Sequence, residues 1–201
     1  EFNETLRYFR QHLIDTGVQV QLDTRVQAAD LSGFDQVVLA TGITPRKVDF
    51  PGADHPMVVS YLDVLLGRVQ AADAVAIIGA GGIGFDVGEF LVHGHGPSST
   101  LDTARWMAEW GVDPDFQARA SLLTPRPEAP ARKVWLLQRS PGKPGAKLGK
   151  TTGWIHRATL KAKGVSMLGG VEYLGVDDDG LHIGIDGQQQ HLAVGTVVVC
   201  A

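Results

Sequence analysis

The fold of this chain can be worked out from residues 75–94, which read VAIIGAGGIGFDVGEFLVHG. An apolar run leads into Gly79-Ala80-Gly81-Gly82-Ile83-Gly84, which matches the pattern G-x-G-x-x-G, and an amphipathic segment follows. We predict a buried strand over 74–79 and a helix over 82–93, joined by this glycine turn.

The glycines of this turn have different predicted tasks. Gly79 permits a sharp turn out of the strand, Gly81 lets a pyrophosphate approach bare backbone, and Gly84 lets the helix pack closely on the strand. The helix N-terminus offers unpaired N–H groups to the phosphates. With a strand and a helix on either side, the pattern favours a dinucleotide site over a plain tight turn. Its predicted residues are Gly79, Ala80, Gly81, Gly82, Ile83 and Gly84.

The end of the next predicted strand, KVWLLQR over 133–139, indicates which dinucleotide binds. An acidic residue there would bind the ribose 2′-hydroxyl of NAD or FAD. This strand ends instead in Arg139, followed by Ser140 and Lys143, which suit a 2′-phosphate. NADPH is therefore favoured over NADH, the alternative being a surface arginine that only solvates the strand end.

Basic residues are concentrated in one part of a chain whose net charge is only −4. From Ala129 to Val171 there is no Asp or Glu, whereas half of all the Lys and Arg lie there, including Lys150, a further candidate for cofactor binding. This pattern predicts an anionic ligand, with a solvated basic face as the alternative. Nucleic acid is disfavoured because aromatic residues do not alternate with the basic ones.

The glycine turn and the basic strand end are far apart in the sequence. The usual separation is about 20 residues, but 55 residues separate Gly84 from Arg139. We predict an insertion over 96–132, with a Ser- and Thr-capped helix over 98–111 that stops at Gly111 and a loop over 113–131.

The other predicted elements place the chain in the α/β class, with a Rossmann-like FAD/NAD(P)-binding fold that has a central parallel sheet and an antiparallel β-meander. Asp179-Gly180 and Asp186-Gly187 are hairpin turn signals for the meander. The predicted helices cover 3–16 (ending at Gly17), 60–66 and 150–163 (closed by Gly164), and the predicted strands cover 18–23, 36–42 and 196–201, with short strands between 165 and 195.

Several other functions are disfavoured by the sequence. A chain of 201 residues with 44% hydrophobic residues can bury a core, and neither a membrane span nor a signal peptide is recognisable, so we expect a cytoplasmic protein without a membrane partner. The single cysteine, Cys200, excludes dithiol chemistry within this chain.

Two motifs resemble binding sites without completing one. Gly149-Lys150-Thr151 lacks the earlier glycine of a P-loop, because Pro144 occupies that position. His93 and His95 lack further ligands nearby, so no metal site is expected. The remaining histidines singled out, His156, His182 and His191, are interpreted as surface or half-buried residues.

Two segments suggest that this chain carries part of a second lobe. VVLATGITPR over 37–46 and VVVCA over 197–201 look like the strands that close the nucleotide-binding lobes of flavin-linked pyridine-nucleotide enzymes. No G-x-G-x-x-G precedes residue 37. We therefore expect residues 1–47 to be a remnant of an FAD-binding lobe and the crossover that follows it, with Thr41 and Gly42 touching FAD. Residues 48–201 are expected to be an NAD(P)H-binding lobe.

The motifs YLDVL, VAIIGAGGIGFD, LLQR, KPG, LGKTTGWIHR, GVSMLGGVEY and DDDGLHI together resemble the C-terminal region of bacterial NADPH-dependent 2,4-dienoyl-CoA reductases, over essentially all 201 residues. The resemblance implies a larger enzyme of fatty acid β-oxidation, in which a barrel with FMN and a 4Fe-4S cluster precedes the FAD and NADPH lobes. Electrons would pass from NADPH through FAD, the cluster and FMN to the dienoyl-CoA. This chain alone would lack the catalytic residues of the barrel.

A second class of function stays open at this point. In the related flavin and iron-sulfur amine dehydrogenases, the equivalent lobe looks structural and holds an ADP-like ligand. This chain could accordingly be a non-catalytic, nucleotide-holding lobe. The basic residues that suit a 2′-phosphate favour the NADPH-binding module.

Overall fold

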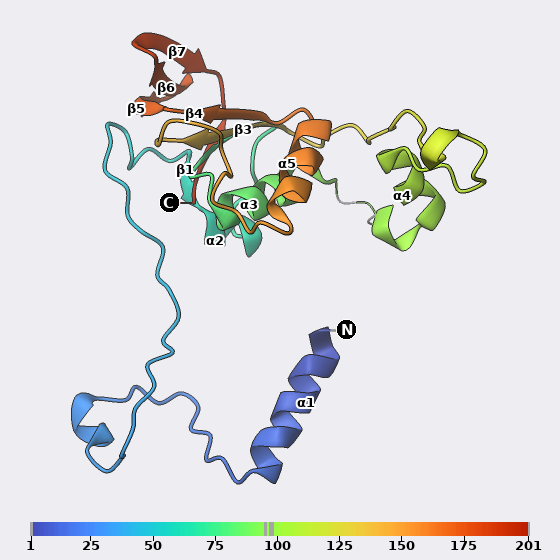
Figure 1. Ribbon diagram of the computed structural model, residues 1–201. Coiled ribbons are helices and arrows are strands. Elements are labelled where there is room, and N and C mark those ends of the chain that lie inside the picture. Colours follow the sequence, from blue (N-terminus) through green and yellow to red (C-terminus); the bar gives the residue numbers. More distant parts are fainter. Residues whose placement is uncertain (1, 95, 97–98, 201) are drawn as a thin grey trace. The chain divides into compact units, whose positions relative to one another are not determined.

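The computed structural model describes residues 2–94, 96 and 99–200. The chain divides into two units, Glu1–Ile43 and Thr44–Ala201 (Figure 1). Nearly all of the core described below belongs to the second unit.

The first unit contains the helix α1 (Phe2–Asp15) and the short 3-10 helix η1 (Ala28–Leu31). Helix α1 ends as predicted at Gly17, which has a φ of 69°. The N–H of Val18 donates to the Leu13 carbonyl at 3.0 Å and that of Gly17 to the Ile14 carbonyl at 3.1 Å. These bonds satisfy the last carbonyls of the helix in the manner of a Schellman motif.

The strands predicted over 18–23 and 36–42 are wrong, because the structure has no strand at either place. Apolar side chains of both segments are exposed, with Val38 at 88% and Leu39 at 80%. A strand is stable only when neighbouring strands pair with its backbone and a core covers its side chains. Neither segment has such neighbours among the described residues of its unit.

The second unit is built on a five-stranded sheet of order β1-β8-β2-β3-β4. Every neighbouring pair in it is parallel, which confirms the predicted central parallel sheet. Its strands are β1 (Val58–Ser60), β2 (Ala74–Ile78), β3 (Lys133–Gln138), β4 (Ser166–Gly169) and β8 (Thr196–Val199). Strand β1 was not predicted, and β4 pairs with β3 rather than with the meander.

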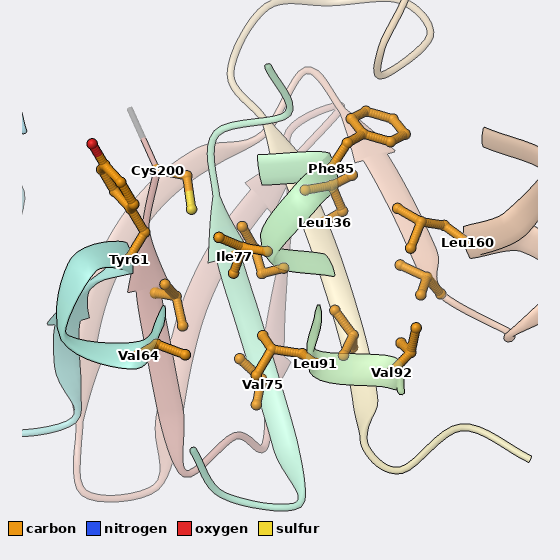
Figure 2. Close-up of a cluster of buried hydrophobic side chains, with 14 of the residues drawn as sticks. Tyr61, Val64, Val75, Ile77, Phe85, Leu91, Val92, Leu136, Leu160 and Cys200 are labelled. Carbon is orange, nitrogen blue, oxygen red and sulfur yellow. The ribbon is translucent and has the colours of Figure 1, made fainter. Parts of the chain in front are cut away.

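Helices cover one face of this sheet. They are α2 (Tyr61–Leu65), α3 (Gly82–Val92) and α5 (Gly153–Ala162), close to the predicted bounds. Figure 2 shows Val75 and Ile77 of β2 among Phe85 and Leu91 of α3, and all of these side chains are at most 1% exposed. Burying each such side chain stabilises the fold by about 1.5–3 kcal/mol.

An antiparallel three-stranded sheet covers the opposite face, as predicted for the meander (Figure 1). Its strands are β5 (Glu172–Asp177), β6 (Gly180–Ile185) and β7 (Gln188–Leu192). Ala76 and Ile78 of β2 point to this side and are buried in a cluster with Leu181 and Ile183. The predicted turn Asp186-Gly187 joins β6 to β7, with φ values of 50° and 76° that a two-residue hairpin turn of type I′ requires.

The predicted insertion lies between α3 and β3. It holds η2 (Ser99–Leu101), α4 (Thr103–Trp110) and η3 (Arg119–Ser121), and α4 ends at Gly111 as predicted, with a φ of 68°. The helix is capped by Asp102, whose Oδ1 accepts from the Arg105 N–H at 3.1 Å, and not by the Ser or Thr residues expected. The insertion leaves β2, α3 and β3 in their usual order.

A buried ion pair links the insertion to the end of α5. The Lys163 Nζ lies 2.8 Å from Glu109 Oε1, and the two side chains are 5% and 12% exposed. Lys163 also donates to the Glu128 carbonyl at 3.2 Å. In the same region, Arg105 pairs with Glu128. The contacts of Lys163 therefore join the insertion to the end of α5, whereas the Arg105–Glu128 pair lies within the insertion.

Candidate functional site

The turn between β2 and α3 has two glycines that the backbone requires. Gly79 has a φ of 110°, a region that residues with a side chain rarely adopt. A Cβ on Gly84 would lie 1.8 Å from the Gly79 carbonyl oxygen, so no side chain fits between the helix and the strand end. These two glycines therefore shape the turn and its close packing.

The two middle glycines of the turn, Gly81 and Gly82, face open space. A Cβ on Gly81 or on Gly82 would have no other atom within 4 Å, and both residues are exposed. Gly81 precedes α3 with φ −84° and ψ −171°, an ordinary extended conformation. The fold itself does not require glycine here, and a ligand that approached Gly81 would meet bare backbone.

The first turn of α3 provides hydrogen-bond donors for such a ligand. The Phe85 N–H donates to the Gly81 carbonyl at 3.1 Å, the first bond of the helix. The N–H groups of Gly82, Ile83 and Gly84 precede that bond and point out of the helix start. Together with the partial positive charge of the helix N-terminus, they favour an anion such as a pyrophosphate.

A cavity of about 340 Å³ lies next to this turn, at the carboxyl ends of β2 and β3. Gly79 and Ala80 line it from the end of β2, and Arg139 and Ser140 line it from the end of β3. The structure thus brings together four of the predicted site residues that the insertion separates in the sequence. Ligands of open parallel sheets bind at this edge.

Positive charge dominates the wall of this cavity. Arg46, Lys47 and Arg139 line it, with Asp49 as the acidic residue on the same wall. Arg139 is exposed, so its guanidinium can reach an anion in the cavity mouth. Gln138 turns back and donates to the Ser140 carbonyl at 2.9 Å, which shapes the chain where β3 ends. This arrangement suits a phosphate monoester.

Sequence reasoning missed an aromatic pair in the same cavity. Tyr173 of β5 and Phe50 both line it, and their ring centroids are 5.9 Å apart. Burial raises the pKa of Tyr173 to about 12, so its hydroxyl stays neutral near pH 7. The two rings, whose planes are tilted by 43° to each other, provide an apolar wall for a base or ribose. Tyr173 lies in the meander, and its neighbours in the sequence do not indicate that it packs against a strand of the parallel sheet.

Two predicted residues lie in the loop between β3 and α5. Lys143 lines a different cavity, of about 430 Å³, together with Trp154 and Lys161. Lys150 is exposed just before α5. The loop packs on α3, because a Cβ on Gly145 would lie 2.6 Å from the Phe85 ring. This basic loop therefore lies near the start of α3, where a ligand on the glycine turn would bind.

The remaining predicted positions are not among the residues that line this cavity. Thr41 and Gly42 belong to the first unit and are exposed. His93 Nδ1 is 2.6 Å from the Glu89 carbonyl of its own helix, and His95 lies outside the described residues. Cys200 is buried, which raises its pKa to about 12 and keeps it a thiol. No helix within the described residues combines the length and the apolar character needed to cross a membrane.

Comparison with known proteins identifies relatives of this chain. The sequence profile described as "Pyridine nucleotide-disulphide oxidoreductase" matches residues 11–201. A metal reductase of Desulforamulus reducens is 27% identical over 193 residues, which cover 92% of this chain and 27% of that protein. A cinnamate reductase of Clostridium sporogenes is 34% identical over 88 residues, which cover 43% of this chain and 13% of that protein.

Two solved structures share the fold. A 2-naphthoyl-CoA reductase in complex with 2-naphthoyl-CoA superposes with a TM-score of 0.65, at 22% identity over 98% of this chain and 25% of that one. The 6-hydroxypseudooxynicotine amine oxidase of Pseudomonas geniculata has a TM-score of 0.58, at 19% identity over 90% of this chain and 24% of that one. The metal reductase and the two solved structures each match most of this chain. This chain spans only about a quarter of the length of each of them.

Proposed function

Because this chain belongs to the pyridine nucleotide-disulphide oxidoreductase family, we propose that it is the NADPH-binding module of a flavin-dependent reductase. Membership makes it a domain of an oxidoreductase that uses FAD and NAD(P)H. The choice of NADPH, the residues that bind it and the larger enzyme are our proposals.

The observation that carries the proposal is the cavity where the glycine turn and Arg139 meet. The exposed backbone at Gly81 and Gly82 would receive the pyrophosphate, and the donors of α3 would bind its oxygens. Arg139, with Arg46 and Lys47 on the same wall, would bind the 2′-phosphate that distinguishes NADPH from NADH. The open backbone of the turn and the basic side chains at the strand end support this assignment.

The module holds and orients its nucleotide and supplies no acid or base of its own to the reaction. NADPH, when bound, supplies a hydride to the flavin. The family name refers to disulphide chemistry, but the chain's single cysteine, Cys200, is a buried thiol with a pKa of about 12. This chain therefore contributes nucleotide binding, and the acceptor would be the flavin of an adjoining lobe.

The larger enzyme that we propose is a reductase of 2,4-dienoyl-CoA or a similar conjugated substrate. The relative named cinnamate reductase supports this substrate class, because cinnamate also carries a C=C bond conjugated to a carboxyl carbon. Residues 1–47 would be part of the FAD lobe, with Thr41 and Gly42 near the flavin, and residues 48–201 the NADPH lobe. FMN and a 4Fe-4S cluster would belong to the barrel of the same polypeptide.

Titration of this chain with NADPH, NADH and ADP tests the proposal. Isothermal calorimetry or nucleotide fluorescence should show NADPH binding more tightly than either of the others. If ADP binds as tightly as NADPH, the chain is instead a nucleotide-holding lobe. Equal affinities for NADPH and NADH would contradict the role of Arg139, and lack of binding by all three would contradict the site.

A further inference from the structure

A cluster of three potential metal ligands lies on the antiparallel meander. Asp177, His182 and His191 each offer a ligand atom, and these atoms all lie within 4.8 Å of one another. They come from three different strands, β5, β6 and β7. His182 and His191 are directly opposite partners in the β6–β7 pairing, and their ring centroids are 4.8 Å apart.

The carboxylate of this cluster is already oriented. Asp177 Oδ1 accepts from the N–H groups of Asp179 and Gly180 at 3.0 and 3.2 Å. Its other oxygen, Oδ2, lies 2.7 Å from His182 Nε2. One oxygen thus holds the hairpin turn while the other faces the imidazole.

The second imidazole is held over the same turn. His191 Nε2 lies 3.1 Å from the Asp179 carbonyl oxygen. A Cβ on Gly180 would lie 3.1 Å from this nitrogen, so the ring approaches closely because residue 180 is a glycine. The backbone of the turn between β5 and β6 therefore positions Asp177 and His191, and the Asp177 side chain positions His182.

We propose that Asp177, His182 and His191 bind a divalent transition-metal ion, with Zn²⁺ as the best match. Two imidazole nitrogens and one carboxylate oxygen form a ligand set typical of Zn²⁺, whereas Mg²⁺ and Ca²⁺ require oxygen ligands. The ion replaces the hydrogen bond between His182 and Asp177 and joins the three strands of the meander. Because the cluster is partly exposed, a water or a further ligand takes the fourth position.

The charge around the turn supports cation binding. Asp178 and Asp179 continue the acidic run of Asp177, and Asp178 pairs with His55 at 3.1 Å. A local excess of carboxylates raises the concentration of cations near the turn. The proposal is independent of the nucleotide site, since it uses none of the residues that line that cavity.

The test is titration of the full chain with Zn²⁺ by calorimetry, and with Co²⁺ by visible absorption, which reports the ligand geometry. We expect one ion per chain. Asp177→Asn, His182→Gln and His191→Gln should each weaken binding by at least about 10-fold, the loss that removal of even an outer partner causes at metal sites. Ca²⁺ and Mg²⁺ in excess should leave Zn²⁺ binding unchanged.

His156→Gln is the matched control. His156 Nδ1 also pairs with a carboxylate, Glu89 Oε1 at 2.8 Å, but no second histidine joins this pair among the clusters found in the described residues. This variant should bind Zn²⁺ like the unmodified chain.

Two results would overturn the proposal. One is saturable Zn²⁺ binding that survives both His182→Gln and His191→Gln, and the other is no saturable binding by the folded, unmodified chain. Because Asp177 also holds the turn, Asp177→Asn could unfold the hairpin, so the two histidine variants decide the outcome. Zn²⁺ should also raise the melting temperature of the unmodified chain but not that of His191→Gln.

Discussion

The carbonyl oxygen of Gly79 lies 1.8 Å from the position that a Cβ of Gly84 would occupy. This relationship sets the distance between the end of β2 and the start of α3. The fold thus requires glycine at Gly79 and Gly84 but not at Gly81 or Gly82. Substitutions at these positions can test this difference.

Gly84→Ala should destabilise the second unit by about 1–3 kcal/mol or more, because the added methyl group forces α3 away from the strand end. Urea denaturation followed by circular dichroism measures the loss. Gly82→Ala is the control, since a Cβ there meets nothing within 4 Å. If both variants unfold at the same urea concentration as the unmodified chain, the close packing at Gly84 is not needed.

Gly81→Val should abolish nucleotide binding and leave the fold intact. Its φ of −84° and ψ of −171° suit a β-branched residue, and the added side chain would occupy the place of the pyrophosphate. Calorimetry with NADPH and a thermal melt measure the two properties separately. A variant that melts early and loses binding together with its structure would show that Gly81 is structural.

Arg139→Ala should remove most of the preference for NADPH over NADH. One charged hydrogen-bonded contact with the 2′-phosphate is worth about 1.5–3 kcal/mol, which is the expected gap between the two nucleotides in the unmodified chain. Affinity for NADH should change little. Arg119→Ala, which removes the same charge from the insertion, is the control, and an equal effect of both variants would indicate a nonspecific influence of charge.

Stability should fall as pH rises above about 9, and Cys200 should cause part of the fall. Burial raises the pKa of this thiol from its ordinary 9.0 to about 12. Between these values the unfolded chain has lost a proton that the folded chain keeps, so unfolding is favoured by up to about 1.4 kcal/mol per pH unit. Burial of Tyr173 acts in the same direction above pH 10, since its pKa rises from 10.0 to about 12.

Urea midpoints at pH 8, 9 and 10 measure this dependence. Cys200→Ala should flatten the fall between pH 9 and 10, whatever it does to stability at pH 8. An identical slope for this variant and the unmodified chain would mean that the thiol is not protected in the folded state.

This chain by itself should not reduce a dienoyl-CoA. Hydride transfer requires the nicotinamide to be held against a flavin, and the glycine turn in residues 75–94 provides for only one of the two dinucleotides. The purified chain, mixed anaerobically with NADPH, FAD and a dienoyl-CoA, should consume NADPH no faster than free FAD does. Faster turnover would place a catalytic site within these residues.

The sequence was sufficient for the elements whose signals are local. The turn around Gly79, the helix end at Gly111 and the hairpin turn at Asp186-Gly187 were all predicted, because each depends on a backbone conformation that only a few residue types adopt. The apolar run of β2 likewise predicted a buried strand, and both faces of β2 are covered in the structure. The α/β fold class followed from these signals.

The sequence predicted that Arg139 meets the glycine turn across the insertion, and only the tertiary structure added Tyr173 and Phe50 to the same cavity. The tertiary structure also placed His182 and His191, which the sequence analysis interpreted as surface or half-buried residues, in one cluster with Asp177. Conversely, the alternation of apolar and polar residues over 18–23 predicted a strand that did not form. A strand needs partner strands and a covering core, and these come from residues that are distant in the sequence. A local sequence pattern contains no information about them.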